Sequence, residues 1–137
     1  MAANKSDTLA NRIVNHILRA TASTAPTTVY AALFTVAPTK TTFGTEVSGG
    51  SYARVDCGAT GTAFDAPTTG ATANSAPIAF PTASASWGLV VACAIVDHIT
   101  DATAANILYF GNLTASKTVD NGDTVTFATG ALTVAET

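Results

Sequence analysis

Residues 87–96 constrain the fold more than any other segment, because they are apolar on both faces of an extended chain. One face would carry Trp87, Leu89, Val91, Cys93 and Ile95, and the other Gly88, Val90, Ala92, Ala94 and Val96. A strand of this kind is covered on both sides. We expect a sheet on one side and a helix on the other.

Several shorter segments alternate in the same two-residue period: 29–34, 52–57, 77–81, 107–110, 124–127 and 131–134. Ala and Thr fill 53 of the 137 positions, a composition that suits packed, pleated surfaces. The pair Asn121-Gly122 predicts a hairpin turn, because both residues tolerate positive φ. Segments 38–50 and 58–75 have loop composition, although short strands can lie within the second. Seven to eight short antiparallel strands predict a mainly β fold, a β-sandwich.

The N-terminal segment predicts one amphipathic α-helix that starts at Ser6 or Asp7 and ends before Pro26. Its apolar half carries Leu9, Ala10, Ile13, Val14, Ile17 and Leu18. We expect Leu9, Ile13 and Ile17 to lie on the protein's own sheet, and the alternative is a partner interface on a different molecule. The chain is then a single domain, 1–137, with the helix and its connector in 1–26 and the β-sandwich in 27–137.

Charge and hydropathy exclude two classes of partner. Six Lys and Arg residues are scattered singly among nine carboxylates, so no basic stripe is present to bind nucleic acid. The longest apolar run, 88–96, is half the length that spans a bilayer, and the N-terminus lacks the apolar stretch of a secretion signal. We therefore expect a soluble protein with no nucleic-acid or membrane partner and no cleaved export signal.

Candidate chemical groups are few, and each is better explained by structure. His16 is expected to be a partly buried helix histidine, and residues 97–101 (Asp-His-Ile-Thr-Asp) a polar turn rather than a metal or proton site. Residues 120–123 predict a turn rather than a calcium loop, because the spacing and the terminal Glu of an EF-hand are absent. Cys57 and Cys93 are expected to be buried thiols, with a disulfide as the alternative. We predict no enzyme activity, cofactor or metal.

Several segments in chain order together resemble a family of small structural proteins of tailed bacteriophages, labelled tail fibre or head decoration protein. They are 28–35 (TVYAALFT), 44–55 (GTEVSGGSYARV), 78–81 (IAFP), 86–88 (SWG) and 121–125 (NGDTV). The resemblance spans nearly the whole chain. It implies a virion component, assembled in the bacterial host cytoplasm, without enzymatic activity, and it transfers no individual functional residue.

The short chain bears on where the protein lies on the particle. A free-standing fibre gains length from repeats or coiled coil, and this sequence offers neither. We therefore predict a capsid decoration or cement protein that acts as an oligomer on the major capsid protein or other virion proteins. The alternative is a tail-tip or tail-fibre-associated adhesion module that uses loops 38–50 and 58–75. A third possibility is a carbohydrate-binding or hydrolytic module built on Trp87, Asp97, His98 and Asp101.

Overall fold

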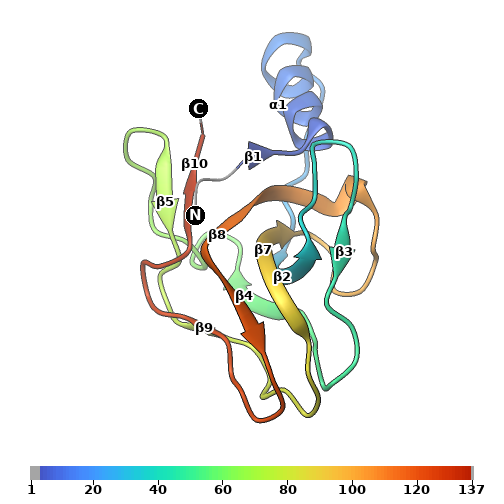
Figure 1. Cartoon of the computed structure of the whole chain (residues 1–137). Coiled ribbons are helices and arrows are strands. Elements are labelled where there is room, and N and C mark those ends of the chain that lie inside the picture. The colour runs from blue at the N-terminus through green and yellow to red at the C-terminus, as the bar shows by residue number, and fades with distance from the viewer. Residues whose placement is uncertain (1–3, 137) are drawn as a thin grey trace.

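Ten strands and one α-helix make up the structure, a computed structural model that describes residues 4–136 (Figure 1). All strand pairs are antiparallel, which confirms the predicted fold class. The elements are β1 (Asn4–Lys5), α1 (Asp7–Arg19), β2 (Thr28–Val36), β3 (Thr45–Glu46), β4 (Val55–Ala59), β5 (Ala71–Ala73), β6 (Ile78–Ala79), β7 (Gly88–Val96), a 3-10 turn (Ala104–Asn106), β8 (Ile107–Val119), β9 (Thr126–Phe127) and β10 (Thr133–Ala135).

The main sheet has the strand order β1-β8-β7-β2-β3, and β4 also pairs with β2. Strand β7 lies in its centre, where Cys93 pairs with Leu33 of β2 on one side and Gly111 of β8 on the other. The apolar segment that most constrained the prediction is therefore the central strand. Two small sheets, β5 with β10 and β6 with β9, form a second layer.

Both faces of the main sheet are covered, but not as predicted. One face packs against the second layer, in a core that includes Leu33, Cys93 and Leu132. The other face carries small residues such as Ala92, and the loop after β2 covers it with Phe43. The Phe43 ring meets Phe34 edge-on at a centroid distance of 5.2 Å. A loop thus takes the place that we expected a helix to fill.

Three local predictions need correction. Strand β4 begins at Val55, so the predicted strand 52–57 starts too early. Strand β8 continues for nine residues beyond the predicted 107–110. The predicted Asn121-Gly122 turn is present, with φ of 91° at Gly122, but it closes no hairpin. The strand before it pairs with β7 and the strand after it pairs with β6.

The two ends of the described chain meet at a small polar cluster. Strand β1 pairs Lys5 with Tyr109, and the Lys5 ammonium forms an ion pair with Glu136. The Tyr109 hydroxyl donates to Glu136 Oε2 at 2.9 Å. Burial would raise the pKa of Glu136, but these two hydrogen bonds outweigh it and lower the pKa.

Both cysteines are buried free thiols, as the sequence predicted. Burial raises the pKa of each to about 12, and nearby negative charge, from Asp56 for Cys57 and from the Cys57 thiolate for Cys93, adds to the shift. Thiols in this state are poor nucleophiles, which is consistent with a packing role.

Candidate partner interface

Helix α1 is fixed to the β-body at its first turn. The Ser6 hydroxyl caps the helix by accepting from the Leu9 amide at 3.1 Å and donates to the Ile107 carbonyl at 2.5 Å. The Ser6 amide also donates to the Leu108 carbonyl at 3.0 Å, and Ser6 is fully buried. From this anchor the helix projects away from the strands (Figure 1).

The polar side of α1 is the side that contacts the protein's own chain. Arg12 Nη1 forms an ion pair with Asp97 Oδ2 at 3.3 Å, just after β7. Its other amino group, Nη2, donates to the Thr24 carbonyl at 2.9 Å, in the connector that follows the helix. Around the helical wheel, Arg12 lies opposite the apolar stripe. The stripe is therefore turned away from the body.

The apolar side chains of α1 lie in solvent, in contrast to the predicted packing on the protein's own sheet. Ile13 is 37% exposed, Val14 51%, Ile17 69% and Leu18 77%. On the same apolar side, Leu9 in the anchored first turn packs against the main core. We call the four exposed residues the α1 stripe. Single exposed aliphatic residues are common on protein surfaces, whereas these four adjoin on one helix face.

A second cluster joins three residues of the 44–55 motif. Arg54 binds the Glu46 carboxylate with two hydrogen bonds of 2.8 Å, from Nε to Oε1 and from Nη2 to Oε2. The Tyr52 hydroxyl donates to Glu46 Oε1 at 2.8 Å and accepts from the Leu33 amide at 2.9 Å. Burial, together with the negative charge of Glu46, raises the pKa of Tyr52, so this hydroxyl remains protonated.

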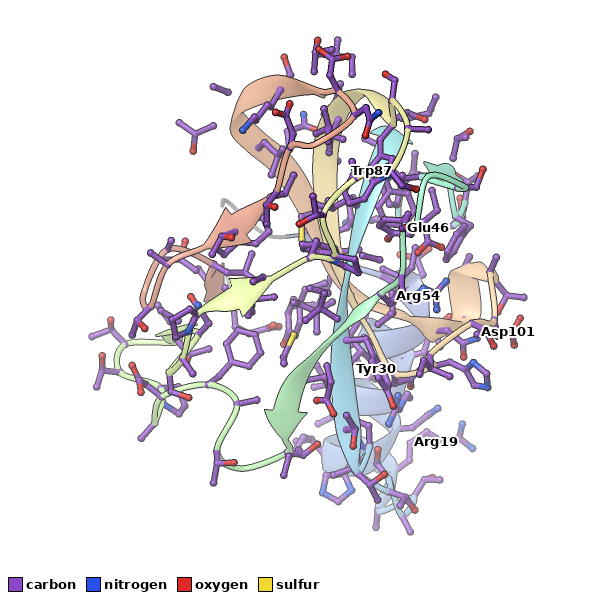
Figure 2. All side chains as sticks on the ribbon, turned by 90° about the horizontal axis from the view of Figure 1, so that it is seen from below. Arg19, Tyr30, Glu46, Arg54, Trp87 and Asp101 are labelled. Carbon is purple, nitrogen blue, oxygen red and sulfur yellow. The ribbon has the colours of Figure 1, made fainter. Side chains whose placement is uncertain are left out.

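This cluster holds the loop between β7 and β8. Arg54 also donates to the carbonyls of His98, at 2.5 Å, and Asp101, at 3.2 Å. Figure 2 shows Glu46, Arg54 and Asp101 on one side of the body. Four of the five guanidinium N–H groups are thus used within the chain, and the Arg54 side chain is only 3% exposed. We call this cluster the latch, because it ties the 44–55 motif to the loop between β7 and β8; Glu46, Tyr52 and Arg54 also line a pocket at this place.

Gly50 of the 44–55 motif contacts Trp87. Its indole Nε1 donates to the Gly50 carbonyl at 2.9 Å, and its ring packs edge-on against Tyr52 at a centroid distance of 5.4 Å. A Cβ at Gly50 would lie 2.9 Å from both Trp87 Nε1 and the Ala85 carbonyl oxygen, so only glycine fits. Trp87 is 5% exposed, which places it in the core and not on a carbohydrate-binding surface.

The other candidate residues serve local structure. His98 Nδ1 accepts from the amides of Thr100 and Asp101 at 3.2 and 2.9 Å, which confirms the predicted turn. Asp123 accepts from the Asp120 amide at 3.0 Å, which confirms the second turn. His16 is exposed rather than partly buried. In the described part of the chain, no three His, Cys, Asp or Glu side chains gather to hold a metal.

Sequence reasoning missed the latch because the alternation of 52–57 predicted a strand but not which residues outside it Tyr52 and Arg54 contact. The signal that could have found it is the rarity of charge. With only six Lys and Arg residues in the chain, an arginine eight residues after a glutamate within the 44–55 motif is a candidate ion pair.

Within residues 4–136, no helix is both long and apolar enough to cross a membrane. None of the curated proteins compared with the chain matches it. The family model described as podophage GP4 fiber I protein gp80 matches residues 4–135, which include α1, the latch and all the sheets. The match accounts for the phage resemblance of the motifs and indicates a structural role in the virion. The chain belongs to the podophage GP4 fiber I protein gp80 family.

Proposed function

We propose that this protein is a non-enzymatic structural module of a phage tail fibre and that it joins the assembly through the α1 stripe. The orientation of α1 is the observation that carries the proposal. Its polar side holds the protein's own chain through Arg12, while Ile13, Ile17 and their neighbours point outward. Leu9 marks the inner end of this surface, where it joins the core.

The size of the α1 stripe supports a contact that is made in the virion. Burying an aliphatic side chain fully is worth roughly 1.5 to 3 kcal/mol. Added together, the exposed fractions of the four residues equal about two fully exposed side chains. Covering the α1 stripe would therefore contribute roughly 3 to 7 kcal/mol before the entropic cost of association. A protein gains this energy only when a second molecule covers the stripe.

The family match favours the tail-fibre alternative over capsid decoration. The matched family is described by a fibre protein, and the match covers nearly the whole chain. The single short helix and small sandwich still offer no shaft, so we assign the chain to a module that attaches to a fibre and not to its length. Of the two loops suggested for adhesion, 38–50 packs Phe43 and Val47 inward and 58–75 packs Ala63 and Phe64 inward, so only the exposed remainder of each is available for contact.

The test is incorporation into phage particles. Ile17→Glu places a charge in the α1 stripe, and Asn11→Glu adds the same charge to an exposed position on the polar side of the same helix. We expect both variants to fold with unchanged stability, and only Ile17→Glu to be lost from purified virions. Immunogold label on the tail of wild-type particles supports a fibre location. Label over the whole head, or normal incorporation of Ile17→Glu, would contradict the proposal.

A further inference from the structure

The turn 97–101, which follows β7, forms part of the wall of the pocket at the latch. Ile99 and Thr100 of the turn line this pocket, as do Glu46 and Arg54 of the latch, and its volume is about 440 Å³. We call it the latch pocket. Both turn residues are exposed, so packing in the core does not fix this part of the wall. The shape of the latch pocket therefore depends on the hydrogen bonds that close the turn.

The imidazole ring of His98 closes the turn. Its Nδ1 accepts from the Thr100 amide at 3.2 Å and from the Asp101 amide at 2.9 Å. A main-chain amide always donates, so Nδ1 carries no proton, and the neutral ring has its proton on Nε2. A charged imidazole donates from both nitrogens. Protonated His98 would therefore lose both hydrogen bonds and place an N–H group against two others.

The other histidine of the chain has the opposite arrangement. His16 Nδ1 lies 3.2 Å from the Thr21 carbonyl oxygen, which can only accept. This Nδ1 therefore carries a proton, and a second proton on Nε2 leaves the hydrogen bond in place. Acid should break the contacts of His98 and preserve that of His16. His16 is thus an internal reference for any effect of protonation.

The charges around the turn favour its opening when His98 is protonated. Arg54 is the cation at the turn, and its Nη1 donates to the His98 carbonyl at 2.5 Å. Two nearby carboxylates already have partners, since Asp97 is paired with an arginine of α1 and Glu46 is paired with Arg54. Among the salt bridges of residues 4–136, none involves Asp101. Protonation thus adds positive charge beside Arg54 and leaves the Asp101 carboxylate as a partner to which the ring can turn.

We propose that the turn 97–101 is a pH-sensitive wall of the latch pocket, closed while His98 is neutral and open when His98 is protonated. The closed turn is present at neutral pH and is lost as the pH falls, because only the neutral ring accepts from the two amides. Opening removes two carbonyl acceptors from Arg54 but leaves its two hydrogen bonds with Glu46. The latch therefore persists, and the change is local. It does not depend on what the α1 stripe binds.

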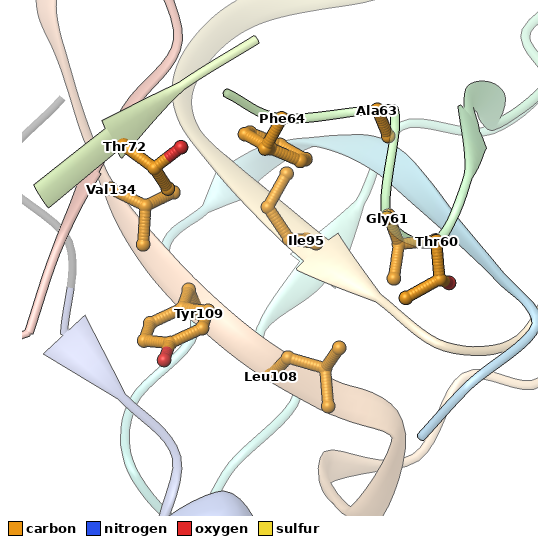
Figure 3. Close-up of a pocket in the computed structure, with 10 residues that line it drawn as sticks. Thr60, Gly61, Ala63, Phe64, Thr72, Ile95, Leu108, Tyr109 and Val134 are labelled. Carbon is orange, nitrogen blue, oxygen red and sulfur yellow. The ribbon is translucent and has the colours of Figure 1, made fainter. Parts of the chain in front are cut away.

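The experiment measures amide exchange and imidazole nitrogen shifts by NMR at about pH 7.5 and about pH 5, the interval in which histidine side chains change charge. We expect His98 to carry its proton on Nε2 at the higher pH. At the lower pH, the protection factors of the Thr100 and Asp101 amides should be about three- to tenfold smaller, because each amide loses one hydrogen bond. Ile95 and Leu108 line the apolar pocket between the main sheet and the second layer (Figure 3). Their amides, in the strands on either side of the turn, should keep their protection.

Three variants separate the proton from the turn. In His98→Asn the side-chain oxygen can accept from the same amides and does not titrate, so the turn should stay closed at both pH values. His98→Ala has no acceptor, and its turn should be open at both. His16→Asn is the matched control on α1 and should keep the response of the wild type. Both histidines are exposed, so these variants are expected to fold.

Three outcomes would overturn the proposal. If His98→Asn keeps the pH response of the wild type, a different group causes it. If the nitrogen shifts show that His98 has gained a proton while the Thr100 and Asp101 amides keep their protection, the turn does not need a neutral ring. If the Ile95 and Leu108 amides lose protection to the same extent, acid acts on the whole sheet and not on the turn.

Discussion

Replacing Arg54 with methionine should destabilise this protein more than the loss of any other charged side chain. Arg54 forms two hydrogen bonds with Glu46 and two more with loop carbonyls, and it lies 5.6 Å from the Phe43 ring centroid. The Arg54 side chain is 3% exposed and that of Glu46 is 15% exposed. Methionine keeps most of the volume but leaves the Glu46 carboxylate buried without its counter-charge.

The expected cost follows from this burial. Breaking a buried ion pair by removing one partner typically costs about 3 to 5 kcal/mol, because an uncompensated charge remains. The Tyr52 hydroxyl still donates to Glu46 in the variant, so we expect the lower part of that range, about 3 kcal/mol. Domains of this size are usually stable by about 5 to 15 kcal/mol. A chain of 137 residues would lose roughly 10 to 15 °C in Tm.

Urea unfolding followed by circular dichroism measures the loss, and Arg12→Met is the matched control. The Arg12–Asp97 pair is 3.3 Å long and partly exposed, so its removal should cost less than about 1 kcal/mol. Adding Glu46→Gln to Arg54→Met should restore part of the stability, because it removes the unpaired charge. If Arg54→Met and Arg12→Met cost the same, the latch does not stabilise the fold and our reasoning is wrong.

Three further predictions follow from single positions. Gly49 and Gly50 both have positive φ, but only a Cβ at Gly50 meets other atoms, so Gly50→Ala should lower the urea midpoint clearly more than Gly49→Ala; equal effects would contradict the tight Trp87 contact. Cys57 and Cys93, whose pKa values are about 12, should resist alkylation at pH 8 in the folded protein and react in urea; rapid labelling of the native protein would refute their burial. Because its pKa is lowered by folding, Glu136 stabilises the protein above its unfolded pKa of about 4.3, and this contribution is lost as pH falls through the lower folded value. The protection factors of the β1 and β10 amides, which correct for the slower intrinsic exchange in acid, should then fall below about pH 4, and an equal fall in β7 would show global unfolding instead.

The sequence predicts those elements whose pattern reflects burial. Strand β7 is buried on both faces and was found within one residue. Helix α1 has a regular 3.6-residue period, and its start was found, whereas its end at Arg19 was predicted only as lying before Pro26. The second half of β8 was missed for the opposite reason. Strand β1 pairs only with Tyr109 and Phe110, so residues 112–118 form an edge with exposed or half-exposed side chains and a loop-like composition.

The loop contacts of the latch and the Trp87 contact lay beyond sequence reasoning because their partners are distant in the chain. Trp87 is 37 residues from Gly50, and Arg54 is 44 residues from His98. Periodicity reports which side of an element is apolar, but not which residues of another element meet it. Which side of α1 faces the body was unpredictable for the same reason, because Arg12 contacts Asp97, 85 residues away in the chain.

That direction needs a cause stronger than the Arg12–Asp97 pair. A partly exposed pair contributes less than about 1 kcal/mol, whereas burying the α1 stripe would contribute roughly 3 to 7 kcal/mol. If the body offered an apolar surface beneath the helix, the helix would turn its stripe inward at little cost. What α1 meets there is the Asp97 carboxylate and the carbonyl of Thr24, both of which would lose hydrogen bonds if aliphatic side chains covered them. The polar surface of the body thus keeps the α1 stripe outward.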